Sequence, residues 1–221
     1  MHRTQPRDLA PRAPRGTVTP MPRPVHPARR YAQLALGLVL FGLSLALMVR
    51  AELGLPPWDV LHQGVAERTP LTFGTVVIAF SLVVMLGWIP LRQRPGVGTL
   101  ANAIGVGLVV DVGLWAIPEV EHLGLRAAML VGGIALCGWS TGLYVGAGLG
   151  PGPRDGLMTG LAARGVPVGV ARVAIELTAL GVGWVLGGTV GVGTVAFALL
   201  VGPVVHWSIP RLRLDGRTPT P

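Results

Sequence analysis

The sequence predicts an all-α membrane protein of six transmembrane helices, arranged as two inverted three-helix repeats. Three observations lead to this fold class. Of the 221 residues, 51% are hydrophobic and only 13% are charged, a balance that a soluble domain cannot cover with polar surface. Six apolar runs each have about the 20 residues that a 30 Å hydrocarbon core requires. A similarity between the two halves of the chain then indicates the repeat.

The chain begins with a basic segment that we expect to be a disordered cytoplasmic tail. Residues 1–30 carry seven Arg, many Pro and almost no apolar periodicity, so they cannot bury enough surface to fold alone. The segment is too long and too rich in Pro for the start of a secretory signal. We therefore expect the apolar run that follows it to remain in the protein as the first span.

Six apolar runs follow the tail, and each predicts one spanning helix. Two of the stretches between them, 50–70 and 148–167, are longer than simple connectors. Each contains a Pro-rich part followed by a helical pattern, which predicts a short re-entrant or interfacial helix after spans one and four. The predicted spans are residues 31–49, 71–91, 96–117, 127–147, 168–187 and 190–209.

The distribution of Arg predicts the orientation of these spans. With alternating sides, fourteen Arg fall on the side of the two termini and three, Arg50, Arg68 and Arg126, fall on the other. Because basic residues collect on the cytoplasmic side, both termini are expected in the cytoplasm. The predicted organisation is a first repeat at 31–117, an external connector at 118–126, a second repeat at 127–210 and a cytoplasmic tail at 211–221.

The internal similarity is strongest just after the first and fourth spans. A shift of 96 residues places the Leu-Gly-x-x-Pro-x-Asp segment at 53–59 on the segment at 149–155. Gly54, Pro57 and Asp59 then fall on Gly150, Pro153 and Asp155, and a shift of 95 residues aligns two copies of Gly-Val-Gly-Thr. Because each copy holds three spans, the second copy must be inverted relative to the first, as in many secondary transporters.

These segments also resemble a known group of proteins. The Leu-Gly-x-x-Pro-x-Asp segment, Gly-Val-Gly-Thr-Leu-Ala-Asn at 96–102 and the later Asp111 are similar to the YczE and YitT group of bacterial membrane proteins, over residues 31–210. The resemblance implies a multi-spanning protein of the bacterial inner membrane without an assigned activity. The second copy departs from the first at Gly152 and Arg154, and His206 stands where the first copy has Asp111, so the halves need not do equivalent work.

Asp59 and Asp155 are candidates for an ion or substrate site. Each follows a Pro that suits the first position of a helix, Pro57 or Pro153. An acidic residue in the first turn also complements the helix dipole, so one interpretation is that each Asp serves only the helix start. The functional alternative is a cation or proton site at a broken helix.

Further ionisable or polar residues lie inside the predicted spans. Arg172 and Glu176 share a helix face and can pair, and Glu176 is deep enough to face a functional cavity or to be purely structural. Asp111 and His206 form a proton relay if the fold brings them together, and otherwise anchor their helices at the membrane surface. Asn102 either hydrogen-bonds between helices or contacts a ligand.

Several classes of function lack their motifs. The sequence has no phosphate-binding loop, no His-Glu-x-x-His helix and no Gly-x-Ser-x-Gly elbow. Its single Cys137 leaves no cysteine cluster for a metal. We therefore expect no enzymatic activity, no metal and no cofactor. Nucleic acid is not an expected partner, because Arg residues beside a span more simply bind anionic lipid.

Two hypotheses of function remain. The first is a small secondary transporter or permease for a small molecule or an ion, with its site where the repeats meet. The second is a membrane scaffold or regulator that binds a partner protein through its spans. The transporter predicts a polar cavity touching both Pro-x-Asp segments, whereas the scaffold predicts a dry, packed centre. Six spans form a slender bundle, so a homodimer is a further hypothesis.

Overall fold

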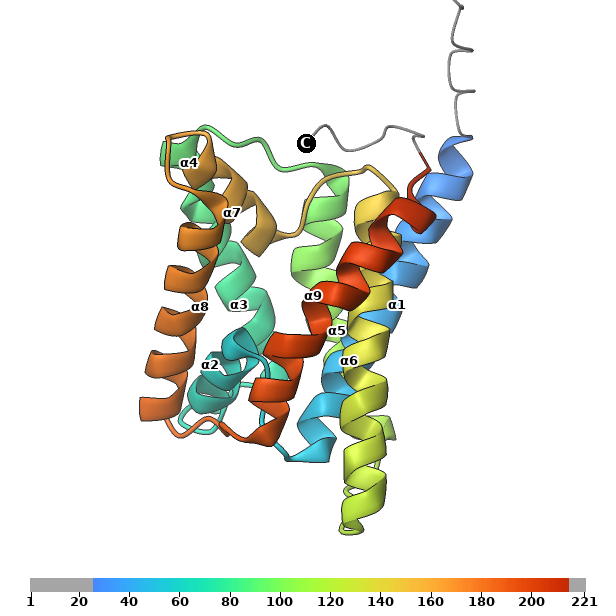
Figure 1. Ribbon diagram of the computed structural model, residues 1–221, viewed down its shortest axis with the longest axis vertical. Helices are drawn as coiled ribbons and strands as arrows, with labels where there is room; N and C mark the ends of the chain where they lie inside the picture. The colour runs from blue at the N-terminus through green and yellow to red at the C-terminus, as the bar shows by residue number, and fades with distance from the viewer. Residues whose placement is uncertain (1–25, 215–221) are drawn as a thin grey trace, which may run out of the picture.

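The computed structural model describes residues 26–214, which fold into helices and connecting segments without strands (Figure 1). Six of the helical segments are long and apolar enough to cross a membrane, with α3 and α4 together forming one of them. The predicted tails, residues 1–25 and 215–221, lie outside the described residues. The helices are α1 (Pro27–Ala51), α2 (Pro57–Ala66), α3 (Phe73–Leu86), α4 (Trp88–Leu91), α5 (Val97–Ala116), α6 (Leu123–Gly146), α7 (Pro153–Ala162), α8 (Val168–Val185) and α9 (Val192–Leu212).

The six expected spans and the two expected short helices are present, with shifted ends. Helix α1 begins at Pro27, four residues before the predicted start of the span and within the segment predicted as tail. A proline is favourable there because its missing N–H is not needed in the first turn. The second span is broken at Gly87 into α3 and α4. The prolines at 57 and 153 are the first residues of α2 and α7.

Helices α1 and α6 pack along each other and form the most extensive contact between two helices. Glycines allow the close approach on both helices: a side chain at Gly37 would meet the backbone of Tyr144, and one at Gly133 would meet Met48. Such small residues are the usual means by which membrane helices associate. Helix α5 lies against α1 and α9 lies against α6, and these four helices hold most of the apolar core.

The remaining helices pack mainly against one another, and α3 also packs on α5. Helix α2 packs on α8, while α7 contacts α3, α4 and α8. The two short helices lie in opposite halves of the molecule, α2 in the lower half of Figure 1 and α7 in the upper half. Helix α1 begins and α9 ends at the same upper end.

Two chain crossings hold the starts of α5 and α9. The Leu53 carbonyl accepts a hydrogen bond from Gly193 N at 2.7 Å, and the Leu149 carbonyl accepts one from Gly98 N at 2.9 Å. The next residue in each case is a glycine with positive φ, 108° at Gly54 and 128° at Gly150. A side chain at either glycine would also collide with the opposing helix start, so both strain and space favour glycine.

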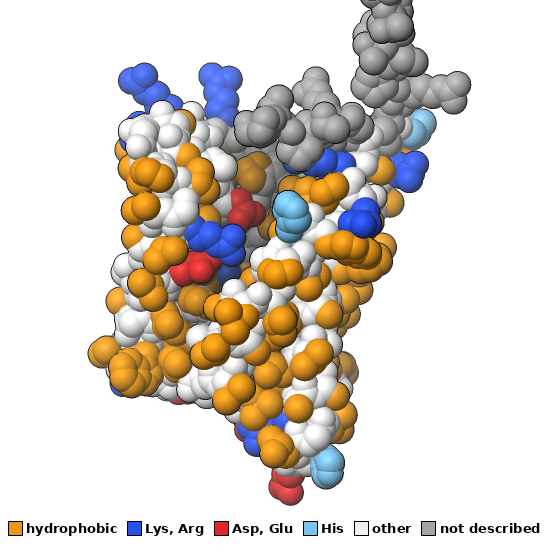
Figure 2. All heavy atoms as spheres, viewed as in Figure 1, with side chains coloured by type: hydrophobic (Ala, Val, Ile, Leu, Met, Phe, Trp, Pro, Cys, Tyr) orange, Lys and Arg blue, Asp and Glu red, His pale blue; other side chains and the backbone are white. Residues whose placement is uncertain are grey.

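The packing of the outer helices is uneven. Helix α3 packs along α5, whereas α8 and α9 are not packed against each other. Figure 2 shows a hollow on this face between α8 and α9, with acidic, basic and histidine side chains on its walls and hydrophobic side chains around it. The surrounding apolar surface, which includes Trp184, Val185 and Val192, is what a lipid-facing surface requires.

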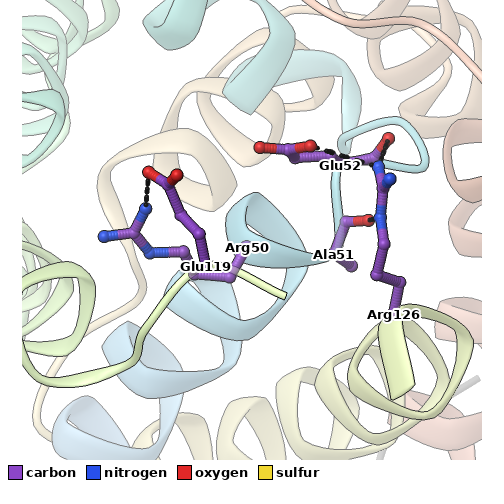
Figure 3. Close-up of polar contacts among 5 residues, drawn as sticks. All are labelled: Arg50, Ala51, Glu52, Glu119 and Arg126. Atoms are coloured by element: carbon purple, nitrogen blue, oxygen red, sulfur yellow. Dashed lines mark hydrogen bonds and ion pairs between the residues drawn. The ribbon is translucent and has the colours of Figure 1, made fainter. Parts of the chain in front are cut away.

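The end of the molecule opposite α7 carries paired charges (Figure 3). The Arg50 guanidinium lies 2.8 Å from the Glu119 carboxylate, and Arg126 lies 3.2 Å from that of Glu52. Arg126 Nε also donates to the Ala51 carbonyl at 2.7 Å, which ties the start of α6 to the end of α1. The acidic residues therefore neutralise two of the three Arg on this side.

Candidate functional site

A cavity of about 390 Å³ lies between the two Leu-Gly-x-x-Pro-x-Asp segments. Both segments contribute to its lining, together with α1, α3, α5, α6, α8 and α9. It reaches the hollow between α8 and α9, because both of those helices line it without packing on each other. Six of the seven predicted site residues line this cavity: Asp59, Asn102, Asp155, Arg172, Glu176 and His206.

Asp59 is the most buried ionisable group of the cavity lining, with 1% of its surface exposed. It is the third residue of α2, where the helix start stabilises a negative charge. Its Oδ1 accepts a hydrogen bond from His62 Nδ1 at 3.0 Å and lies 3.7 Å from an Arg154 guanidinium nitrogen. Its Oδ2 has no hydrogen-bond partner among residues 26–214. One carboxylate oxygen of Asp59 therefore accepts no hydrogen bond within the described structure.

Arg154 connects the two segments. It belongs to the second segment, directly before Asp155, yet it lies beside Asp59 of the first. Its guanidinium also stacks over the Trp58 ring, 4.9 Å from the ring centroid, in the geometry of a cation–π contact. The 96-residue shift places Trp58 on Arg154, so two residues at corresponding positions contact each other.

Asp155 has a different environment from Asp59. It is half-buried at the start of α7, and its Oδ2 accepts a hydrogen bond from the Tyr144 hydroxyl at 3.1 Å. Desolvation by the surrounding protein raises the pKa of the Asp155 carboxyl above its usual value, although the Tyr144 hydrogen bond opposes this shift. Two aspartates in the same motif therefore differ in burial and partner.

His62 is fully buried in α2 and belongs to the same cluster. Desolvation lowers the pKa of its imidazole, while the hydrogen bond with Asp59 acts in the opposite direction. The lowered pKa favours a neutral ring that donates through Nδ1 to the carboxylate. His62 thus positions Asp59 without adding a second positive charge beside Arg154.

Helices α8 and α9 supply the other wall of the cavity. Arg172 Nε donates to Glu176 Oε1 at 3.0 Å, and the two side chains are 52% and 31% exposed. Glu176 is the ninth of the 18 residues of α8, so it lies near the middle of that span. An ion pair at this depth is costly against lipid and is normally found beside water or a polar partner. The position of the Arg172–Glu176 ion pair on the cavity wall accounts for its presence inside the span.

Asp111 is not brought to the cavity. Its carboxylate accepts hydrogen bonds from the Thr72 hydroxyl at 2.5 Å and from Gly74 N at 2.7 Å. It therefore ties α5 to the first turn of α3, and His206 lines the cavity without it. The two residues do not form the relay considered for them from the sequence.

Sequence reasoning passed over two members of the site. Arg154 departs from the motif, and its alignment with Trp58 of the first segment is the signal that could have found it. His62 was not singled out, although its position three residues after Asp59 puts both side chains on one helix face. Position in the repeat and helical spacing were thus the available signals.

The cavity lining combines three carboxylates, two guanidinium groups and a histidine with apolar side chains. In the part of the chain that the structure describes, no three His, Cys, Asp or Glu side chains gather to hold a metal ion. When all three carboxylates are ionised, Asp59, Asp155 and Glu176 face two guanidinium groups, those of Arg154 and Arg172. With His206 neutral, the lining carries one net negative charge.

Comparison with known proteins identifies relatives without assigned activities. Residues 28–210 match the profile of a family of unknown function, DUF6198. An uncharacterized protein of Haemophilus influenzae is 39% identical over 175 residues, covering 79% of this chain and 80% of the relative. The uncharacterized membrane protein YczE of Bacillus subtilis is 34% identical over 179 residues, covering 79% and 83%. The uncharacterized protein YyaS of the same bacterium is 23% identical over 188 residues, covering 82% and 92%.

The relationship to YczE confirms the resemblance drawn from the motifs. No solved structure matches the chain. The relatives support a membrane protein with several spans, because one of them is named as a membrane protein and six helices here have the length and composition to cross a bilayer. They name no substrate.

Proposed function

Because this chain belongs to the DUF6198 family, a family of unknown function, its activity has to be argued from its own residues, and we propose that it is a small secondary transporter or permease. The observation that carries this proposal is the cavity that touches both Pro-x-Asp segments. Its volume of about 390 Å³ lies within the range of pockets for small molecules. Its ionisable lining suits a polar or charged solute.

The proposal includes an inverted repeat of two three-helix units. The swapped contacts support it: the first Leu-Gly segment holds the start of α9, and the second holds the start of α5. The positions of α2 and α7 in opposite halves of the molecule also support it (Figure 1). In transporters built this way, the binding site lies where the repeats meet, at broken helices near the middle of the bilayer.

We further propose that the protein lies in a bacterial inner membrane with both termini in the cytoplasm. The Arg distribution favours this orientation. On the opposite side, Glu119 and Glu52 pair with Arg50 and Arg126 (Figure 3). The upper end in Figure 1 is then the cytoplasmic end, and α7 lies in the cytoplasmic half.

The alternative is a scaffold or regulator that binds a partner protein through its spans. A scaffold has no need of ionisable side chains around an internal space, because each of them costs free energy at membrane depth. The central cavity therefore favours transport over a scaffold. Activity as an enzyme has no support in an arranged pair of nucleophile and base among the cavity residues.

An unbiased uptake experiment tests the proposal. Vesicles containing the purified protein would be incubated with a bacterial metabolite extract, and the accumulated solutes identified by mass spectrometry. We expect at least one solute to accumulate with the native protein and to fall by about tenfold or more with Asp59→Asn or Glu176→Gln, as expected when a group that binds the transported species is lost.

Glu121→Gln is the matched control, since Glu121 is an exposed carboxylate in the connector before α6. Its vesicles should accumulate the same solutes as those of the native protein. Uptake that is equal in the native protein and in the Asp59 and Glu176 variants would contradict the proposed site. The absence of any protein-dependent uptake would contradict transport itself and leave the scaffold.

A further inference from the structure

The charge balance of the cavity favours a cation. When all three of its carboxylates are ionised, they outnumber its two guanidinium groups by one, and the surrounding helices are largely apolar. In such surroundings an uncompensated negative charge is costly, and a single positive charge removes the imbalance. The solute that fits best therefore carries one positive charge.

The free oxygen of Asp59 indicates what kind of cation. Asp59 Oδ2 is buried and accepts no hydrogen bond from residues 26–214, and a buried acceptor without a donor costs free energy. The same carboxylate already holds His62 through Oδ1. A ligand that donates an N–H to Oδ2 satisfies this position, which favours an ammonium or guanidinium group over a cation without donors.

Arg154 is held weakly enough for a ligand to displace it from Asp59. Its nearest nitrogen is 3.7 Å from Asp59 Oδ1, beyond the length of a good hydrogen bond. Its guanidinium also lies over the face of the Trp58 ring. Its side chain is 27% exposed, and an arginine side chain has many accessible rotamers. It is therefore close enough to compensate Asp59 and held loosely enough to move.

We propose that the cavity binds a monovalent organic cation through Asp59, and that Arg154 is a tethered cation which occupies this position when the cavity is empty. The ligand's N–H group takes Asp59 Oδ2, and the Arg154 guanidinium withdraws from the carboxylate. This inference rests on the proposed function, because it names the class of solute for the same site. It makes Arg154 a competitor of the ligand and Asp59 its binding group.

Calorimetric titration of the protein in lipid nanodiscs at about pH 8, where carboxylates are normally ionised, tests the proposal. The probe is methylguanidinium, which matches the Arg154 head group, and its neutral counterpart is methylurea. We expect Arg154→Ala to bind methylguanidinium at least about tenfold more tightly than the native protein, because the competing cation is gone. Asp59→Asn in the Arg154→Ala background should abolish this gain, and methylurea should show none.

Arg94→Ala is the matched control, since Arg94 is exposed in the connector before α5. It should bind as the native protein does. If Arg154→Ala does not give monodisperse protein, Arg154→Gln removes the same charge with less loss of packing. Unchanged or weaker binding of methylguanidinium without Arg154, or a gain that survives Asp59→Asn, overturns the inference.

The outcome can be separated from that of the uptake experiment, because the titration measures binding and needs no flux. Uptake that depends on Asp59 and Glu176, together with a failed titration, removes the cation and keeps the transporter. A successful titration without any uptake removes the transporter and keeps the cation site.

Discussion

Asp59 and Asp155 occupy the same position in two similar segments, yet they have different partners. The sequence allowed their helix starts to be predicted, because Pro57 and Pro153 each begin a helix in the structure. Their partners come from other parts of the chain: Arg154 is far from Asp59 in sequence, and Tyr144 reaches Asp155 from α6. Such side-chain contacts depend on how helices cross, which hydrophobic periodicity does not specify.

Asp111 lies inside a span, but its contacts are structural. It is an ionisable residue inside a span, which is the usual sign of a functional site, but it accepts hydrogen bonds at the start of α3. The Thr72 hydroxyl and the Gly74 N–H, which both donate to this carboxylate, explain why an ionisable side chain is tolerated inside the span. Neither donor could be assigned to Asp111 from the spacing of residues alone.

We expect Asp111→Ala to destabilise the protein by about 1–3 kcal/mol, because it leaves the Gly74 N–H and the Thr72 hydroxyl without their acceptor. The measurement is the apparent melting temperature in detergent, with the exposed Glu121→Ala as control. Solute uptake per folded molecule should be retained. A variant as stable as the native protein would show that this contact does not hold α3.

At the scale of elements, six spans and two short helices followed from hydrophobicity, Pro and length. The ends were less predictable, because they depend on tertiary contacts. Helix α6 begins at Leu123, before the predicted 127, and Arg126 in its first turn is held by the Ala51 carbonyl and the Glu52 carboxylate. The break at Gly87 coincides with the burial of Trp88, whose Nε1 donates to the Pro153 carbonyl.

The contact between α2 and α8 depends on one glycine face. A side chain at Gly183 would collide with the backbone of Leu61 and Val60, whereas one at Gly181 would have nothing within 4 Å. We expect Gly183→Ala to destabilise the protein by about 1–3 kcal/mol, since backbone atoms cannot move aside easily. Gly181→Ala should be neutral or slightly stabilising, because alanine favours a helix over glycine by about 0.5–1 kcal/mol.

Thermal unfolding of both variants in the same detergent checks this prediction. The two positions lie on one helix and differ by two residues, so membrane insertion should be affected equally. Equal melting temperatures would mean that α8 can shift on α2 at little cost.

At the scale of the whole molecule, the repeat in the sequence located the cavity more closely than any single residue did. Both Pro-x-Asp segments line it, as the transporter hypothesis required. The bridge from Arg154 to Trp58 and Asp59 was not foreseen, because the sequence alignment treats Arg154 as a mismatch. In the proposed inverted repeat, residues near the two-fold axis would contact their own counterparts, whose identities need not match.

The proposed topology predicts that both termini lie on the same, cytoplasmic side. Green fluorescent protein fused to either end should fluoresce, and alkaline phosphatase fused to either end should be inactive, because the first folds in the cytoplasm and the second requires the oxidising periplasm. A phosphatase fusion within residues 118–122, before α6, should be active. Termini on opposite sides of the membrane would exclude the three-plus-three arrangement.

The unequal packing of two helix pairs, α3 with α5 and α8 with α9, suggests how a transporter of this kind would work. Helix α3 packs on α5, while α8 stands away from α9, so helix pairs that correspond in the sequence alignment are packed differently. If each half can adopt the packing of the other, a second conformation needs no new kind of contact: α8 closes on α9 and α3 swings away from α5. The mouth of the cavity would then move to the end where α2 lies, and the solute would find itself facing the far side of the membrane.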